Sequence, residues 1–413
     1  MRLSAIVRRL SFACLALALL LRSHPQASAS REIAPGDDWC ATIAALSPGD
    51  ELVLGRGEHA GPCAIRNGGA PGAPIVIRGK DSQNPSRLAY SGPGPSVIQI
   101  HASHVVLKHL RFGPTMPATY AIRLVDGHDI AIEDNVFADL GGSALTLNHR
   151  SAHDVIVRGN RITNPGATAM YFGCHDGRAC VISSLLVERN YLTGVRADPD
   201  EIGYGIQVKL NSTGIIRDNV IVNTKGPGIM VYGAEDRDRI SLIEGNFVSG
   251  SRTSSAIVLG GGPAIVRNNI ATSSAEGGIG LEDYARRGLL RGIIVVHNTV
   301  SDNAEGGITA PKTGLLEARI LNNVAHARPG TSAFPVIPVG VESAGNVDCG
   351  TSPCFRDASQ RDFSPVVARV GALLSAPWAP RDDYFGRRRE TPAVAGAIER
   401  SGPPIRLEMK ASR

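Results

Sequence analysis

One lysine stands out among the residues whose type and position could support acid–base chemistry. Lys209 ends the strand-like fragment of the stretch YGIQVKLNS (204–212), whereas the similar Gly-Ile-x-Val fragments of this chain end in other residues. A lysine on a rigid element can act as a base when burial or a nearby cation lowers the pKa of its amine. The alternative is an ordinary solvated lysine on the face of a sheet.

Short repeated fragments would position this lysine. Each begins with a small or compact residue and then alternates apolar with variable positions, and consecutive fragments lie 22 to 36 residues apart. They start at residues 97, 121, 144, 169, 205, 228, 256, 278 and 307. Short strands at this spacing, joined by Gly, Asn and Asp turns without helical periodicity, predict an all-β fold: a single-stranded right-handed parallel β-helix, or solenoid.

A second motif follows the fragments: an apolar pair, then polar residues, then asparagine. Its asparagines are Asn135, Asn160, Asn190, Asn219, Asn246, Asn269, Asn298 and Asn323. We expect their amides to bond between successive coils. Two residues before each Asn, the charge alternates through Glu133, Arg158, Glu188, Arg217, Glu244 and Arg267. Neighbouring strands lie about 4.8 Å apart, so alternating charges can pair, and these arginines are expected to be structural.

The N-terminus has the pattern of an export signal. Residues 1–29 combine a basic start, an apolar run over 10–21 and a small-residue cleavage site at 27–29. Removal of this segment takes four arginines from a net charge of +5, which leaves the mature chain near +1. Such a charge gives no support to a nucleic-acid partner, and no later segment is apolar for long enough to span a membrane. We expect a secreted or periplasmic monomer.

Six cysteines follow the signal segment and fall into close pairs. The pairs are Cys40 with Cys63, Cys174 with Cys180, and Cys349 with Cys354. In an exported protein this pattern predicts disulfides, and no histidine lies at ligand spacing beside two cysteines. The expected division is a cap over 30–72 with a short helix from about Trp39, the β-helix over 73–335, and a C-terminal cap and tail over 336–413.

The variable positions of the fragments should face outward, because side chains alternate along a strand. The catalytic candidates are Lys209, Tyr232 and His175, and the substrate-binding candidates are Arg123, Asn148, Tyr171, Arg178, Tyr204, Gln207 and Glu282. Tyr232 lies one coil, about 5 Å, from Lys209 and could protonate a leaving group. Aromatic and polar groups on stacked coils suit an extended sugar chain.

Three insertions flank this face. GCHDGRAC (173–180) and GVRADPDEIGY (194–204) both lengthen the coil before Lys209. GLEDYARRG (280–288) adds a third cluster of charged and aromatic residues two or three coils further on. Long loops on a regular scaffold commonly carry function.

Two stretches resemble polysaccharide lyase family 6, the alginate lyase and chondroitinase B family of β-helix enzymes in the pectate lyase-like superfamily. They are LSPGDELVLGRGEHAGPCAIRNGGAPGAPIVIRG, which starts at residue 46, and YGIQVKLNSTGIIRDNVIVNTKGPGIMVYG, which starts at residue 204. Lys209 occupies the position of that family's catalytic lysine, and Tyr232 the position of its arginine. The family's calcium-binding acids are replaced by Ile202 and Tyr204, with Glu201 nearby, so the resemblance implies a Ca²⁺ cofactor whose ligands are incomplete here.

The second stretch is also similar to the "YG" strand of β-helix mannuronan C5-epimerases, in which a histidine stands at the position of Lys209. These resemblances imply an exported lyase that cleaves an acidic, uronate-containing polysaccharide by β-elimination, with Lys209 as base. The alternatives are a uronate C5-epimerase and a non-catalytic β-helix for polysaccharide binding or exopolysaccharide assembly. A glycoside hydrolase would need two carboxylates about 5–9.5 Å apart, for which Glu282 and Asp283 are the nearest candidates.

Overall fold

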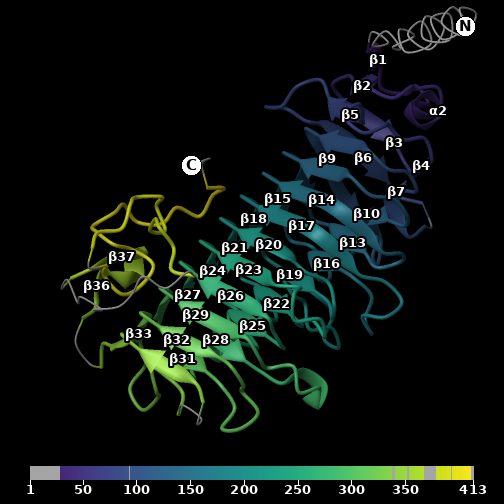
Figure 1. Cartoon of the computed structure of the whole chain (residues 1–413). Helices are drawn as coiled ribbons and strands as arrows, with labels where there is room; N and C mark the ends of the chain where they lie inside the picture. The colour runs from purple at the N-terminus through teal and green to yellow at the C-terminus, as the bar shows by residue number, and fades with distance from the viewer. Residues whose placement is uncertain are drawn as a thin grey trace, which may run out of the picture.

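The computed structural model describes residues 28–92, 94–336, 340–350, 353–366, 378–391 and 393–410. Within them the chain winds into a right-handed parallel β-helix with three parallel sheets along its length (Figure 1). This confirms the fold class predicted from the repeats. Residues 1–27, most of the expected signal peptide, lie outside the described residues. No helix in the described part of the chain has the length and hydrophobicity needed to cross a membrane.

The three sheets each take one strand from successive coils. The first sheet contains β1 (Ser30–Ile33), β2 (Glu51–Leu54), β5 (Ile75–Gly79), β8 (Val105–Lys108), β11 (Ile130–Glu133), β14 (Ala152–Arg158), β17 (Ile182–Glu188), β20 (Gly214–Arg217), β23 (Ser241–Glu244), β26 (Ala264–Arg267), β29 (Ile293–Val296), β32 (Arg319–Leu321) and β34 (Glu342–Ala344). The second contains β3 (Glu58–Ala60), β6 (Ser86–Tyr90), β9 (Leu110–Thr115), β12 (Val136–Ala138), β15 (Arg161–Thr163), β18 (Tyr191–Thr193), β21 (Val220–Val222), β24 (Phe247–Ser249), β27 (Ile270–Thr272), β30 (Thr299–Ser301), β33 (Val324–His326) and β35 (Val347–Asp348). The third contains β4 (Cys63–Ile65), β7 (Ser96–Ile100), β10 (Tyr120–Leu124), β13 (Leu145–Leu147), β16 (Met170–Phe172), β19 (Ile206–Val208), β22 (Ile229–Val231), β25 (Ile257–Leu259), β28 (Gly277–Leu281) and β31 (Gly306–Thr309).

One continuous hydrophobic core fills the interior between the sheets. The inward residues of every repeat join it, including Ile206 and Val208 of β19. Each fully buried aliphatic side chain contributes about 1.5–3 kcal/mol relative to an exposed one. Since no coil encloses its own apolar side chains, the stacked coils stabilise one another.

The predicted asparagine ladder is confirmed and extends to Asn346. In each step the side-chain oxygen of one asparagine accepts hydrogen bonds from the backbone and side-chain nitrogens of the asparagine one coil before it. Asn219 is fully buried, and its Nδ2 also donates to the carbonyl of Val187 at 2.9 Å. These bonds satisfy turn backbone groups that the strands leave unpaired.

The alternating charge column is also confirmed. Glu188 is in register with Arg158 on one side and Arg217 on the other, and each arginine donates to it at 2.6 Å. Burial opposes the charge on Glu188, but Arg217 and Arg158 outweigh it and hold the pKa of the carboxyl below its usual value. The arginines of this column are therefore occupied in a structural ladder.

The N-terminal region differs from the expectation of a capping helix. The helix α2 (Trp39–Ala44) begins at Trp39, and the Asp38 side chain accepts from the backbone nitrogen of Ala41 at its N-cap. At six residues it is little more than one turn, so the described residues show no clear capping helix. The disulfide Cys40–Cys63 joins α2 to β4, and Cys174–Cys180 and Cys349–Cys354 are present as predicted.

The C-terminal residues pack against the outer face of the second sheet (Figure 1). A second apolar cluster forms between outward residues of β18, β21, β24, β27 and β33 and side chains from the last sixty residues, which include β36 (Phe355–Asp357), the short 3₁₀ helix η2 (Ala358–Gln360) and β37 (Asp362–Pro365). Arg389 and Glu399 form a buried ion pair in this region at 2.8 Å. The C-terminal part of the second sheet is thus covered, and the third sheet carries the predicted site on its outer side.

Candidate active site

The outward positions of the third sheet lie in the register that the repeats predicted. Tyr171, Gln207, Met230 and Val258 pair across β16, β19, β22 and β25. Lys209 follows β19 directly, and its backbone nitrogen donates to the carbonyl of Phe172 at 2.8 Å. The sheet therefore fixes the point from which the Lys209 side chain leaves the strand.

Lys209 is not an exposed cation, since it is only 2% exposed. Its Nζ atom lies 4.1 Å from the ring centroid of Tyr232 and 5.4 Å from that of Tyr171. No carboxylate within the described ranges forms an ion pair with it. Burial, and secondarily the nearby Arg287, lowers the pKa of Lys209 to about 8.

A hydrogen-bonded pair of tyrosines lies beside the lysine. The hydroxyls of Tyr204 and Tyr232 are 3.1 Å apart, and Gln207 Nε2 donates to the Tyr232 hydroxyl at 3.0 Å. Burial, then the bond with Tyr204, raises the pKa of Tyr232, and burial raises that of Tyr204. Burial also raises the pKa of Tyr171 to about 12. All three tyrosines are therefore neutral proton donors near neutral pH.

Tyr204 and Tyr232 belong to a separate apolar cluster outside the main core. It consists of Tyr204, Leu210, Met230, Tyr232, Val258 and Leu289, with Tyr284 packed against them. The Tyr284 ring meets the Tyr232 ring edge-on at 4.5 Å between centroids. The cluster explains how an outward-facing lysine comes to be buried.

Tyr284 and Arg287 belong to the third cluster seen in the sequence, but they were not among the predicted catalytic or binding residues. They belong to the 280–288 insertion, where the short 3₁₀ helix η1 (Tyr284–Arg286) follows β28. One guanidinium nitrogen of Arg287, Nη1, is buried without a hydrogen-bond partner in the structure. The sequence showed this insertion as a charged and aromatic cluster. It did not show that the insertion packs near Lys209, because this depends on the path of the loop across the stacked coils.

The insertion before Lys209 is fixed by a second lysine. Lys225 Nζ donates to the backbone carbonyls of Asp198, Pro199 and Glu201. Between this insertion and the third sheet runs an open groove of about 460 Å³. Its lining combines the insertion with the outer cluster and comprises Pro199, Asp200, Glu201, Ile202, Tyr204, Lys225, Pro227, Met230, Thr253, Ser254, Val258, Glu282 and Tyr284. Tyr204 thus connects the groove to the tyrosine beside Lys209.

The remaining predicted residues lie around this centre. His175 and Arg178 are exposed on the loop closed by Cys174–Cys180, which packs beside Lys209 through a 3.2 Å bond from Asn211 to the Gly177 carbonyl. Within the described residues, neither side chain forms a hydrogen bond or an ion pair with Lys209. Arg287, and not Arg178, is the cation that affects the lysine pKa.

Two predicted binding residues lie further toward the N-terminus. Arg123 hydrogen-bonds to His149 and lies over the Tyr120 ring. The Asn148 side-chain oxygen is buried and has no partner. Both residues belong to the coils before β16, so the structure does not bring them to Lys209.

Glu282 is one of the residues that line the groove. Burial of the carboxyl among protein atoms, and then the charge of Glu276, raises its pKa, although the residue itself reaches solvent. Asp283 instead accepts from the Gly288 backbone nitrogen at 3.0 Å. Among the acidic residues, Glu276 is the one whose charge raises the pKa of Glu282.

The residues before Lys209 do not fit a calcium ion. Ca²⁺ takes six to eight oxygen ligands, several of them carboxylates. Ile202 is 51% exposed, Tyr204 is buried in the tyrosine pair, and the Glu201 carbonyl is bound by Lys225. In the described ranges, the groups of His and Asp side chains that lie close enough together to hold a metal ion are on the first sheet instead. No step proposed below uses calcium.

Comparisons with known proteins agree with this architecture. The family described as "Right handed beta helix region" matches residues 178–336. XylC, in the structure of its complex with xylose, superposes with a TM-score of 0.54 at 9% identity, over 90% of this chain and 99% of XylC. No curated protein matches the chain.

An alginate lyase and a mannuronan C-5 epimerase are also similar in fold, with lower TM-scores. An alginate lyase from Paenibacillus sp. str. FPU-7 gives a TM-score of 0.42 at 15% identity, over 77% of this chain and 99% of that one. The A-module of the Azotobacter vinelandii mannuronan C-5 epimerase AlgE6 gives 0.49 at 11%, over 75% and 92%. The family match and the superposition on XylC agree with the right-handed parallel β-helix fold, and the fold is all that they show.

Proposed function

We propose that the protein is an exported polysaccharide lyase that cleaves an acidic, uronate-containing polysaccharide by β-elimination, with Lys209 as the base. One observation carries the proposal: Lys209 is buried outside the main core, without a carboxylate partner, and its pKa is lowered to about 8. Burying an unpaired charge is costly, and groups perturbed in this way concentrate at functional sites. A lysine amine with this pKa is partly neutral near pH 7–8 and can accept a proton.

The chemistry divides between the lysine and its neighbours. Lys209 takes the C5 proton of the uronate, the electron pair forms the C4–C5 double bond, and the C4–O4 bond breaks. Tyr232 keeps its own proton at neutral pH and donates it to the departing O4. The unpartnered nitrogen of Arg287 is available for the substrate carboxylate, whose charge grows as the C5 proton leaves.

The groove would hold sugars that flank the cleaved bond. Tyr204, Met230 and Tyr284 offer apolar faces, while Lys225 and the insertion before Lys209 offer polar groups. His175 and Arg178 on the disulfide loop, together with Arg123 and Asn148 in earlier coils, extend this surface. Export is supported by the three disulfides, which are typical of secreted and periplasmic proteins.

The test is a panel of uronate polymers assayed for the unsaturated product by its ultraviolet absorbance. We expect at least one polymer to be cleaved, and Lys209→Ala to abolish cleavage, whereas Lys312→Ala, at an exposed lysine of the 309–315 turn, should retain it. If no polymer yields unsaturated product, the lyase proposal is wrong. Exchange of the C5 proton with deuterated solvent without cleavage would identify an epimerase, and polymer binding without either reaction would identify a binding protein.

Glycoside hydrolysis is a second candidate because of one observation on Glu282. Burial and the nearby Glu276 raise the pKa of its carboxyl, as a general acid requires. Hydrolysis would release reducing ends without unsaturated product, and would be lost in Glu282→Gln but retained in Lys209→Ala. The two activities are thus distinguished by both product and variant.

A further inference from the structure

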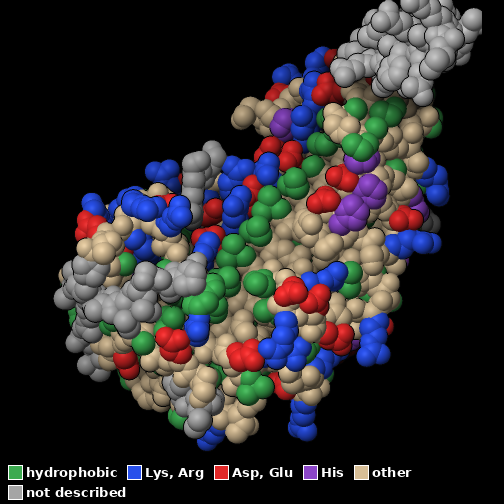
Figure 2. Space-filling model, viewed as in Figure 1, with side chains coloured by type: hydrophobic (Ala, Val, Ile, Leu, Met, Phe, Trp, Pro, Cys, Tyr) green, Lys and Arg blue, Asp and Glu red, His purple; other side chains and the backbone are tan. Residues whose placement is uncertain are grey.

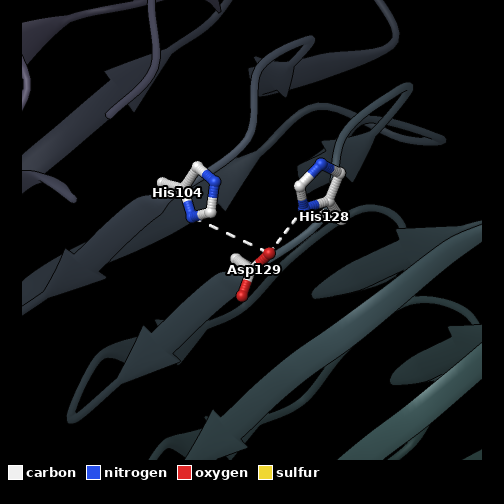
Figure 3. A group of neighbouring side chains, drawn as sticks. All are labelled: His104, His128 and Asp129. Atoms are coloured by element: carbon white, nitrogen blue, oxygen red, sulfur yellow. Dashed lines mark hydrogen bonds and ion pairs between the residues drawn. The ribbon is translucent and has the colours of Figure 1, made fainter. Parts of the chain in front are cut away.

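A group of histidine and aspartate side chains on the first sheet has no part in the proposed function. It lies just before β8 and β11 and in the first residues of β14, whereas Lys209 follows a strand of the third sheet. Figure 2 shows histidines beside acidic side chains on the face of the N-terminal half. Figure 3 shows His104 and His128 turned toward Asp129.

We propose that His104, His128 and Asp129 bind a divalent transition-metal ion of the Zn²⁺ class. Each offers one ligand atom, and these atoms lie within 4.8 Å of one another. Two imidazoles and a carboxylate favour Zn²⁺ and similar ions over Ca²⁺ or Mg²⁺, which prefer oxygen ligands alone. The proposal is independent of the proposed function.

The distances are close to those that an ion would impose. Bonds of about 2.0–2.1 Å in a tetrahedral site place neighbouring ligand atoms about 3.3 Å apart. His104 Nδ1 is 3.7 Å from Asp129 Oδ2, so this pair needs only a small adjustment. His128 Nδ1 now hydrogen-bonds to the same oxygen at 2.5 Å, and the exposed aspartate must rotate slightly to admit an ion between them.

The backbone holds these side chains in a repeated arrangement. His104, Asp129 and Asp154 occupy one column, since the residues that follow them pair in register, and all three have left-handed φ values between 53° and 57°. His128 and His153 occupy the preceding column, and their rings stack at 4.5 Å. In the neighbouring coils, the same columns contain Ala73 and Pro74 on one side and Ser183 and Ser184 on the other. The ligand-type residues are thus confined to three successive coils and are not a feature of the repeat.

The site also has room for a ligand beyond the protein. His104 and Asp129 line a groove of about 350 Å³ together with outward apolar residues of β8, β11 and β14. Three protein ligands leave one coordination position of a tetrahedral ion open, and here that position can face the groove. An ion would also tie the coil of His104 to the coil of His128 and Asp129.

A second grouping shares Asp129 and must be separated from the first by experiment. Asp129, His153 and Asp154 also bring their ligand atoms within 4.8 Å, but they offer one imidazole and two carboxylates. His153 Nδ1 hydrogen-bonds to Asp154 at 2.7 Å. The grouping with two histidines is the one that a transition metal should prefer.

The experiment is a titration of the untagged, chelator-treated protein with Co²⁺, followed by visible absorption, and with Zn²⁺, followed by calorimetry. We expect one Zn²⁺ per chain with micromolar or tighter affinity, intense Co²⁺ bands typical of four or five ligands, no displacement by excess Ca²⁺, and a higher Tm with Zn²⁺. His104→Asn, His128→Asn and Asp129→Asn should each weaken Zn²⁺ binding at least tenfold. His326→Asn, at a histidine on β33 in the second sheet, should leave it unchanged.

Asp154→Asn distinguishes the two groupings, because it removes a ligand of the second only. The proposal requires that this variant stay within threefold of the parent affinity. Binding that is absent, that survives Asp129→Asn, or that falls more with Asp154→Asn than with His104→Asn would overturn it. Circular dichroism of each variant separates lost binding from lost folding.

Discussion

The ammonium of Lys209 lies over the ring of Tyr232, with Nζ 4.1 Å from the ring centroid, and no carboxylate in the described part of the chain neutralises it. An aromatic face stabilises a desolvated cation by about 2 kcal/mol, less than water does. The lysine therefore lowers the stability of the fold unless it loses its proton. This conflict between stability and an unusual charge is typical of functional sites.

Replacement of Lys209 by methionine should therefore stabilise the protein. The pKa of the lysine is about 8 in the folded chain and 10.5 in the unfolded chain, so the unfolded state binds the proton more tightly. The resulting penalty is constant below pH 8, shrinks as the pH rises from 8 to 10.5, and is absent above that range. The shift corresponds to about 3 kcal/mol, part of which is offset by the lost contact with the tyrosine rings, so we expect a gain of about 1–3 kcal/mol at pH 7.

Urea denaturation of Lys209→Met at pH 7 and pH 10 measures this effect. The gain should be smaller at pH 10, and the matched variant Lys312→Met should show no gain at either pH. A loss of stability at pH 7 would mean that the ammonium makes net favourable contacts in the folded protein.

The rate of cleavage should follow the neutral form of the same amine. Below pH 8, kcat/KM should rise about tenfold per pH unit and then level off, since the base must be unprotonated. Arg287→Gln removes the cation that helps to lower the lysine pKa, so the midpoint should move to higher pH. Arg286→Gln, at the exposed neighbouring residue, should leave the midpoint in place. A pH profile without a midpoint near 8 in the parent protein would exclude Lys209 as the base.

Tyr232→Phe should reduce kcat by two orders of magnitude or more while leaving the fold intact. The change removes the proposed donor to O4 and leaves the ring beneath the lysine, and general acids contribute about 10²–10⁴-fold. Tyr204→Phe is the matched control, because it removes the other hydroxyl of the same hydrogen bond and should cost much less. Equal losses in the two variants would show that the hydrogen bond, and not proton donation by Tyr232, is what matters.

The repeats predicted the fold and the outward columns because both depend on local, regular spacing. The register of Tyr171, Gln207 and Met230 follows from alternation along a strand and from the recurrence of one fragment per coil. Burial of Lys209 did not follow, because Tyr284, which packs on Tyr232, and Arg287, which lowers the lysine pKa, belong to an irregular insertion after β28, three coils further on. No repeat specifies the path of such a loop.

The histidine cluster was missed for a different reason. His104, His128 and His153 recur at intervals close to one coil, which was a usable signal. His104 and His128 precede strands of the first sheet and His153 lies in β14, whereas the repeated fragments that indicated the site form the third sheet. The pairing of β8 with β11 places Asp129 level with His104, while His128 lies one residue earlier in the column that it shares with His153. The sequence spacing of the histidines alone does not show this arrangement.

Removal of one side chain from the asparagine ladder should be strongly destabilising. Asn219→Ala would leave the buried backbone nitrogen of Asn190 and the carbonyl of Val187 without these partners, and it would remove one of the two bonds of Asn190 Nδ2. With about 1–3 kcal/mol for each buried group left unsatisfied, we expect a loss of at least about 3 kcal/mol by thermal or urea denaturation. Asn346→Ala, at the half-exposed end of the ladder, should cost clearly less. Similar losses at the two positions would contradict a cooperative buried ladder.

Acid sensitivity of the fold should depend on His297, which lies beneath the C-terminal segment. It is 1% exposed, and burial, followed by the charge of Arg389, lowers its pKa from 6.5 to about 3. Below pH 6.5 the unfolded chain gains a proton that the folded chain does not accept, so the histidine costs stability progressively as the pH falls toward 3. Its full contribution is up to about 5 kcal/mol. Urea midpoints between pH 7 and pH 4 should fall steeply in the parent and in His326→Asn, and less steeply in His297→Gln. Parallel slopes in the parent and His297→Gln would show that other groups, such as the buried Arg389–Glu399 pair, control acid unfolding.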